Sequence, residues 1–156
     1  IRVLNGNLYR NIEWPVVVML AAMIPVGQAL ETSGISLNIA NFISSTTDGM
    51  ALPWLILMIL VITMFVSDIV NNAATAVIMA PIAANLALQV GQPVEPFLMA
   101  VAVGASCAFL SPIGHQCNTL VMAPGNYKFG DYWRLGLPLE CVIVAISIPM
   151  ILFVWT

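Results

Sequence analysis

Long uncharged runs, separated by a few charged residues, dominate the pattern of hydrophobic and polar positions along this chain. About 17 residues between Glu13 and Glu31 carry no charge, which is near the lower limit for a helix that crosses a bilayer. Residues 49–67 form a second run of about 19, also long enough to cross. Between the two, residues 35–43 place apolar side chains at helical spacing with Ser and Asn among them. This is typical of a helix lying along the membrane interface.

Two further uncharged runs contain polar side chains that an ordinary spanning helix lacks. Residues 69–94 include the small polar cluster 71–75, close behind Asp68. Residues 96–127, about 32 in number, are too long for one straight crossing and are interrupted by Pro, Gly, His and Gln within 111–118. Backbone that leaves the helix at membrane depth must be buried in protein or line a wet cavity, because lipid offers no hydrogen bonds. The two breaks therefore mark the candidate functional region.

Composition agrees with a membrane environment. The 156 residues are 61% hydrophobic and 7% charged, whereas a soluble domain carries about 25% charged residues. So few charges cannot cover a globule of this size, and the exposed apolar patches would be large. The chain starts at Ile1 and shows no signal peptide, so we interpret it as one membrane unit within a longer polypeptide.

Composition and motifs also argue against several functional classes. Cys107, Cys117 and Cys141 show no CxxC spacing, so neither a disulfide framework nor a zinc site is indicated. A net charge of −3 with four basic residues argues against nucleic acid as a partner. An intramembrane protease needs paired aspartates, a Ser–His pair or a zinc motif, and only one aspartate here is flanked by hydrophobic sequence. We therefore expect neither an enzyme nor an enzymatic cofactor.

Helices that break at membrane depth are a recurring device of secondary transporters. Their half-helix N-termini attract anions, while freed carbonyl and amide oxygens bind Na⁺. Asparagine suits both duties, because its side chain has an acceptor and two donor hydrogens. The pair of polar breaks thus favours a transporter of small anions. Simpler interpretations stay open: Asn71 and Asn72 as hydrogen bonds between helices, residues 112–114 as a plain kink, and His115 as a packing residue.

At these breaks the sequence resembles the divalent anion/sodium symporter family of the ion transporter superfamily. The stretch Ser67–Thr75, SDIVNNAAT, is similar to the Ser-Asn-Thr hairpin tip of that family. Residues 104–118, with a Ser-Pro step and Asn118, are similar to its broken helix, and residues 27–34 fit as well. The resemblance covers nearly the whole chain. It implies an all-α integral membrane fold that forms the second of two inverted repeats, with spanning helices, a re-entrant helical hairpin and a broken helix.

The hydrophobic pattern and the resemblance together predict six segments. They are a span at 14–31, an interfacial helix at 34–46, a span at 50–66, a re-entrant hairpin at 67–90, a broken span at 95–125 and a span at 135–155. The hairpin tip is expected at Asn71 to Thr75. As the C-terminal half of a larger transporter, this unit would pair with an N-terminal half. The resemblance also implies a homodimer in the lipid bilayer of the cell, as a plasma membrane or bacterial inner membrane protein.

The resemblance assigns roles at matching positions. Asn72 stands where the family has the asparagine that contacts both substrate and Na⁺, and Asn118 matches the asparagine of the broken helix that helps to hold a second Na⁺. The candidate substrate-binding residues are Asn71, Asn72, Ala73, Thr75, His115, Asn118 and Thr119. The candidate Na⁺ ligands are Asn72, Gly114 and Asn118.

The chain departs from the family pattern at the site itself. Asn71 replaces a serine, Ala73 replaces a threonine, and residues 115–117, His-Gln-Cys, replace the usual Thr-Pro-Pro. Two hydroxyls are lost and an imidazole is gained, which near neutral pH is either neutral or positively charged. These changes resemble the branch of permeases with cytosolic regulatory domains, for which sulfate or another inorganic anion is the implied substrate.

We therefore predict a segment of a secondary active transporter that moves a small anion, a sulfate-like oxyanion or a di- or tricarboxylate, coupled to Na⁺. The alternative is a Na⁺/H⁺ antiporter or oxyanion exporter of the same superfamily fold. That activity needs a titrating group at depth, either Asp68 or His115. A helical subunit without a transport role is a third interpretation, and it would require residues 67–90 to cross the membrane instead of turning back.

Overall fold

The computed structural model describes residues 14–47 and 49–155, and every regular element in these ranges is an α-helix. In chain order the helices are α1 (Trp14–Thr32), α2 (Ile35–Thr46), α3 (Leu52–Ile69), α4 (Asn72–Gln89), α5 (Glu95–Ala105), α6 (Gln116–Met122) and α7 (Phe129–Trp155). The predicted all-α fold is confirmed. Three of the described helices, α3, α4 and α7, are long and apolar enough to cross a membrane by length and composition.

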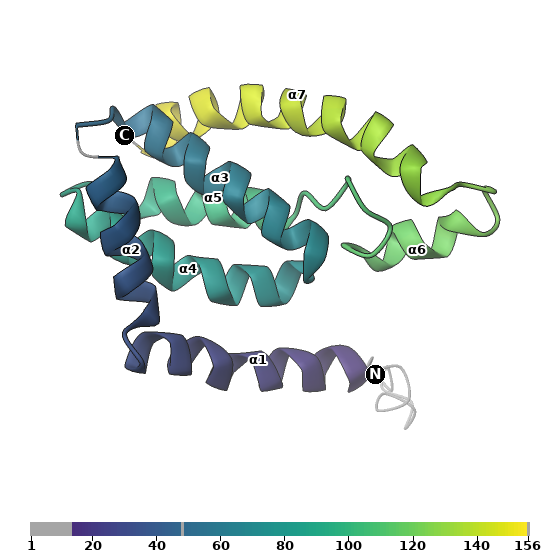
Figure 1. Cartoon of the computed structure of the whole chain (residues 1–156), viewed down its shortest axis with the longest axis horizontal. Coiled ribbons are helices and arrows are strands. Elements are labelled where there is room, and N and C mark those ends of the chain that lie inside the picture. Colours follow the sequence, from purple (N-terminus) through teal and green to yellow (C-terminus); the bar gives the residue numbers. More distant parts are fainter. Residues whose placement is uncertain (1–13, 48, 156) are drawn as a thin grey trace, which may run out of the picture.

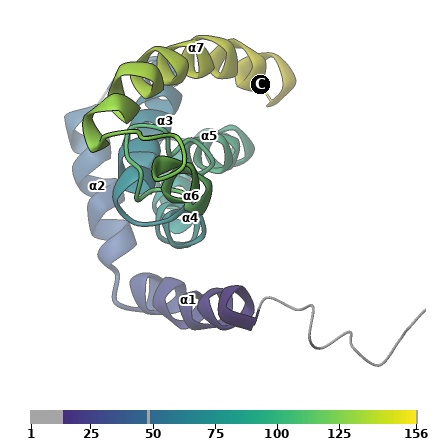
Figure 2. The ribbon, with the colours of Figure 1, turned by 90° about the vertical axis from the view of Figure 1, so that its right-hand side faces the viewer.

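The helices form a stack with α1 at one side and α7 at the other. In Figure 1, the axes of α1, α4, α5 and α7 lie roughly horizontally across the picture. α3 crosses α5 obliquely, and α2 runs across the helix ends. Figure 2 shows α4 and α5 between α1 and the arched α7. The short α6 lies beyond the end of α5, on the far side of an irregular segment. This arrangement brings the end of α3, the start of α4 and the irregular segment to one end of the stack.

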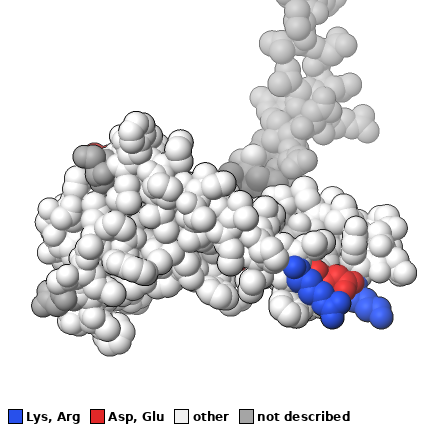
Figure 3. Space-filling model, turned by 90° about the horizontal axis from the view of Figure 1, so that it is seen from above, with Lys and Arg blue, Asp and Glu red and all other residues white. Residues whose placement is uncertain are grey.

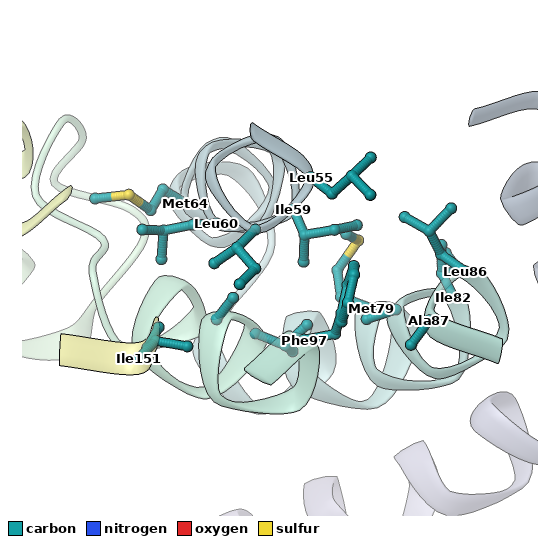
Figure 4. Packing of buried hydrophobic residues seen from close by; sticks show 14 of the residues in the cluster. Leu55, Ile59, Leu60, Met64, Met79, Ile82, Leu86, Ala87, Phe97 and Ile151 are labelled. Carbon is teal, nitrogen blue, oxygen red and sulfur yellow. The ribbon is translucent and has the colours of Figure 1, made fainter. Parts of the chain in front are cut away.

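The core lies where α3, α4 and α5 meet. Figure 4 shows Ile59 and Leu60 of α3 directed towards the side chains of α4 and α5, with the fully buried Phe97 of α5 below them. Within a bilayer, apolar side chains gain little by leaving lipid, so helices associate through close fit and small residues. Small side chains are accordingly abundant among the fully buried residues of α2, α4 and α5: Ala40, Ala83, Ala87 and Ala100.

Gly104 sets the distance between α3 and α5. A Cβ at this position would lie 2.9 Å from the carbonyl oxygen of Leu60 and 2.9 Å from the Cβ of Thr63. Both separations are too short for carbon in contact with backbone, so only glycine lets the two helices approach this closely. The end of α5 therefore packs closely against α3, and the segment that follows α5 lies at the end of α3.

The helix boundaries differ from the predicted segments at three places. The interruption of the broken span, predicted within 111–118, is observed at 106–115. The region 67–90 does not contain two helical arms: α3 continues to Ile69, and α4 is one helix of 18 residues despite Pro81. The chain reverses at 70–71, so α3 is the first arm of the pair and α4 the second. The last helix begins at Phe129, six residues before the predicted start at 135.

The reversal at 70–71 has a local cause. Val70 leaves the helical conformation with φ −99° and ψ −119°, and Asn71 is extended. The side-chain oxygen of Asn71 accepts a hydrogen bond from the N–H of Ala74 at 2.8 Å, which caps the first turn of α4. Asn71 therefore ends one helix arm and starts the next. Because α4 has enough residues for a full crossing, its re-entrance remains a prediction.

Polar residues farther along α4 tie this helix to α2. The Nδ2 of Asn85 donates to the Oγ of Ser36 at 3.3 Å, and the Nε2 of Gln89 donates to the Oδ1 of Asn41 at 2.6 Å. Hydrogen bonds between helices are the usual use of amide side chains in membrane bundles. Asn85 and Gln89 thus act as hydrogen bonds between α4 and α2.

Charge is nearly absent from the described surface. On the face drawn in Figure 3, nearly all of the blue and red atoms gather at one end, and most other described atoms are white. The basic residues among those described are Lys128 and Arg134, which flank Asp131 around the start of α7. Farther along α7, large apolar side chains are exposed, including Leu135, Ile146 and Phe153. Such a surface suits lipid or further protein around it.

Candidate functional site

The hydroxyl of Ser67 joins three helix ends at one point. Ser67 is fully buried at the end of α3, and its Oγ donates to the carbonyl oxygen of Ala105 at 2.8 Å. The same Oγ lies 3.0 Å from the Oδ1 of Asn72, the first residue of α4. A hydroxyl carries one proton, which these two oxygens share. The structure thus places the candidate residue Asn72 against the point where α5 breaks.

Asp68, the next residue, fastens the end of α3 to the interrupted segment. Its Oδ1 accepts from the N–H of Leu110 at 3.0 Å, and its backbone carbonyl accepts from the Oγ of Ser111 at 2.7 Å. Asp68 and Glu140 each keep one buried oxygen without a partner among the described residues. The end of α3 therefore holds the interrupted segment at both Leu110 and Ser111.

Gly114 and Asn118 close the interrupted segment onto the same point. A Cβ on Gly114 would lie 2.8 Å from the Cβ of Ala108 and 3.1 Å from the Cα of Asp68, so a side chain would push the segment away from α3. The Nδ2 of Asn118 donates to the carbonyls of Ala108 (2.8 Å) and Ser111 (3.1 Å). The amide nitrogen of Asn118 is thus engaged, and its amide oxygen remains available as an acceptor.

His115 and Thr119 use their polar atoms inside the segment. The Nδ1 of His115 accepts from the N–H of Cys117 at 3.2 Å, and its ring is exposed. The hydroxyl of Thr119 donates to the carbonyl of Pro112 at 2.6 Å, so its single proton is engaged. His115 retains Nε2 as a group that can meet an anion, whereas Thr119 retains only acceptor capacity.

Three further candidates lie in the first turn of α4, at the reversal. Asn71 caps the helix as described, and Ala73 is half-buried. Thr75 is fully buried, and its Oγ1 has no partner within the described part of the chain. Because a fully buried hydroxyl cannot reach a solvated ligand, Thr75 faces the interior of the helix packing in this conformation. The structure therefore brings Asn72, Gly114 and Asn118 to one cluster, with His115 and Thr119 at its edge.

A small cavity lies behind Asn118, between α6 and α7. Its volume is about 190 Å³, and its lining is aromatic and apolar apart from the side chains of Asn118 and Asp131. Tyr132 on its wall donates from its hydroxyl to the carbonyl oxygen of Asn118 at 2.7 Å. The ring of Tyr132 also meets that of Tyr127 edge-on, with centroids 6.2 Å apart. α7 thus holds α6 in position through Tyr132.

Sequence reasoning missed the residues that assemble the site. Ser67, Ser111 and Tyr132 bond to backbone carbonyls on other helices or segments, and only their distant partners show that function. One local signal was available: a serine or aspartate beside a helix break often forms hydrogen bonds with nearby backbone groups. No cluster of three or more His, Cys, Asp or Glu that could hold a metal occurs among the described residues.

Membrane-length helices whose polar groups converge at two helix breaks define the class of secondary transporters. The sequence profile of the citrate transporter family matches residues 2–104 and, in an overlapping match, residues 53–156. The chain belongs to this family. It is thus an integral membrane segment of a transporter and not an enzyme.

Relatives with curated names agree with this assignment. The chain is 38% identical over 146 residues to the uncharacterized transporter sll0640 of Synechocystis sp., covering 94% of this chain and 24% of the relative. It is 32% identical to sodium/sulfate cotransporter 2 of Chlamydomonas reinhardtii, covering 92% of this chain and 16% of the relative. It is 30% identical to the sodium-dependent high-affinity dicarboxylate transporter 3 of Caenorhabditis elegans, covering 90% of this chain and 25% of the relative. The chain spans a quarter or less of the length of these relatives.

Proposed function

We propose that this chain is the C-terminal repeat of a Na⁺-coupled secondary transporter for a small oxyanion, with sulfate as the first candidate. The observation that carries the proposal is the meeting of two helix breaks, at 70–71 and 106–115, joined through Ser67, Asp68 and Ser111. Broken helices that converge in this way supply both dipole ends and free carbonyls. The names of relatives, sodium/sulfate and sodium-dependent dicarboxylate transporters, support a Na⁺-coupled anion carrier.

The cation site is proposed at Asn72, Gly114 and Asn118. Asn72 and Asn118 carry amide oxygens, and Gly114 brings its backbone within van der Waals distance of the end of α3. Buried oxygen atoms in excess of donors favour a cation, because an unsatisfied buried acceptor costs about 1–3 kcal/mol. Asp68 and Glu140 each keep a buried oxygen without a partner among the described residues, which adds two further acceptors near the breaks.

The anion is proposed to lie at the start of α4, near Asn71, Asn72 and Ala73, with His115 at the edge. The N-terminus of an 18-residue helix favours negative charge. The family's second hydroxyl is missing at Ala73, and the hydroxyl of Thr75 is buried. With fewer hydroxyl contacts available along its length, this site suits a compact oxyanion better than an extended dicarboxylate.

Further parts of the proposal concern assembly. The N-terminal transporter half would supply the rest of the site, and a homodimer in the membrane is proposed by resemblance. Exposed apolar side chains along α7, such as Leu135 and Phe153, leave a surface that lipid or the other half would cover.

A test compares uptake of radiolabelled sulfate and succinate by the full-length protein in liposomes, with and without a Na⁺ gradient. We expect sulfate uptake that depends on Na⁺ and exceeds succinate uptake. Replacing Asn72 with Ala should raise the Na⁺ concentration for half-maximal uptake roughly tenfold, because one oxygen ligand is lost. Asn85→Ala, which removes an amide that bonds α2, is the matched control and should leave this value unchanged. Equal Na⁺ dependence of both variants would contradict the cation site.

The second candidate function, a Na⁺/H⁺ antiporter or oxyanion exporter, is favoured by one observation: Asp68 is a buried acidic side chain at the helix breaks. The antiporter predicts that a Na⁺ gradient drives proton movement without any anion. A pH-sensitive dye inside the same liposomes would report this movement. Proton flux without sulfate would favour the alternative over the symporter.

A further inference from the structure

Ser111 occupies the centre of the interrupted segment. Its Oγ donates to the carbonyl of Asp68 at 2.7 Å and accepts from the N–H groups of Ile113 (3.2 Å) and Gly114 (3.1 Å). A hydroxyl has one donor hydrogen and two acceptor lone pairs, so all of its capacity is used. Its own carbonyl accepts from the Nδ2 of Asn118 at 3.1 Å. One residue thus connects the end of α3 to both proposed cation ligands of the broken span, to Gly114 through its side chain and to Asn118 through its backbone carbonyl.

The side chain of Ser111 forms hydrogen bonds with backbone groups that have no partner within a helix. The last four carbonyls of a helix lack partners within the helix, and Asp68 lies within the last turn of α3. The two N–H groups that donate to the hydroxyl of Ser111 lie in the irregular backbone between α5 and α6. Ser111 therefore satisfies three backbone groups at once and fixes the turn that presses Gly114 against Asp68. Asn72 is held to the same point through Ser67.

We propose that Ser111 is a positioning residue that sets the geometry of the cation site by locking Gly114 and Asn118 to the end of α3. The proposal rests on the proposed function, since it concerns the same Na⁺ site. It adds a residue that binds neither ion nor substrate and acts through the backbone of those that do. Threonine keeps a hydroxyl at this position, whereas alanine removes it.

Ser111→Ala in the full-length protein should raise the Na⁺ concentration for half-maximal sulfate uptake roughly tenfold, because three backbone groups lose their partner. Ser111→Thr should restore the wild-type value to within about threefold. Ser106→Ala is the matched control: this hydroxyl donates to the carbonyl of Ala102 within α5 and is exposed. It should leave Na⁺ dependence unchanged. A Ser111→Ala protein with wild-type Na⁺ dependence would overturn the proposal.

A second measurement does not require transport. Cys117 is exposed and adjoins the segment that Ser111 holds, so it reports the order of that segment. With the other cysteines of the full-length protein replaced by serine, maleimide labelling of Cys117 should be faster in Ser111→Ala than in wild type, Ser111→Thr or Ser106→Ala. Equal labelling rates would overturn the positioning role. If wild-type uptake shows no Na⁺ dependence, the proposed function fails, and the labelling rates alone then decide the role of Ser111.

Discussion

Tyr132 shows how a single side chain on a neighbouring helix holds a candidate site residue in place. Its hydroxyl donates to the backbone carbonyl of Asn118, and its ring packs edge-on against Tyr127. The amide of Asn118 is meanwhile engaged with two carbonyls of its own segment. The orientation of this asparagine is thus set by contacts with backbone carbonyls and with Tyr132, and its amide oxygen is the proposed cation ligand.

We expect Tyr132→Phe to weaken Na⁺-dependent uptake by a few-fold in apparent Na⁺ affinity. The phenyl ring preserves packing, while the lost hydroxyl frees the carbonyl of Asn118, a loss of about 0.5–1.5 kcal/mol. Tyr127→Phe is the control, because Tyr127 contributes a ring contact to the same pair and its side chain is exposed. Kinetic measurement of Na⁺ dependence in liposomes checks both. Identical behaviour of the two variants would show that the Tyr132 hydroxyl has no part in the site.

At the scale of elements, the packing of α5 on α3 decides where the broken span lies. Gly104 brings α5 close to the backbone carbonyl of Leu60 and to the side chain of Thr63. From there α5 ends at Ala105, whose carbonyl accepts from Ser67. The break in one helix is therefore aligned with the end of another by a small residue and one hydroxyl.

Gly104→Val should lower the stability of the folded protein by about 1–3 kcal/mol, because the added carbons meet backbone that cannot move aside. Thermal unfolding of the detergent-solubilised full-length protein, followed by tryptophan fluorescence, measures the effect as a lower midpoint. Gly130→Ala is the control: a Cβ there meets nothing within 4 Å, and alanine favours the helix. A Gly104→Val protein as stable as wild type would mean that α3 and α5 are farther apart in the membrane.

At the scale of the whole molecule, the question is how the α3–α4 pair sits in the bilayer. The start of α3 and the end of α4 border one cavity of about 330 Å³, lined by residues that include Leu52 and Gln89. Both outer ends of the pair therefore lie together, as a hairpin requires. A re-entrant pair and a pair that crosses fully differ only in the depth of the tip at 70–71.

Cysteines introduced at Met50, Val70 and Gln92 distinguish these two arrangements. For a re-entrant hairpin that enters from the outer face, an impermeant maleimide should label positions 50 and 92 quickly from that face. Position 70 should react slowly from either face, and sulfate with Na⁺ should protect it, because the tip then lies at membrane depth beside the site. Rapid labelling of position 70 from the face opposite to 50 and 92 would show a full crossing and would remove the hairpin.

The sequence by itself determined that this is a helical membrane segment of a transporter. Helix formation depends on bonds between residues four positions apart and on runs of apolar side chains, both of which can be read locally. The two interruptions, near Asn71 and within 111–118, were predicted for the same reason, since Pro, Gly and small polar residues disturb that local pattern. The family assignment followed from these motifs and agrees with the profile match.

Only the tertiary structure decided which polar atoms meet. The bonds of Ser67 to Ala105 and of Asp68 to Leu110 join residues about forty positions apart, and helix packing brings them together. Packing also determined that α3 is the first arm of the reversal and that Thr75 is enclosed. The capping contact of His115 depends on backbone angles in irregular chain, which no hydrophobic periodicity encodes. The helices are therefore determined by interactions between residues close in sequence, whereas the arrangement of polar groups at the helix breaks depends on contacts between residues far apart in sequence.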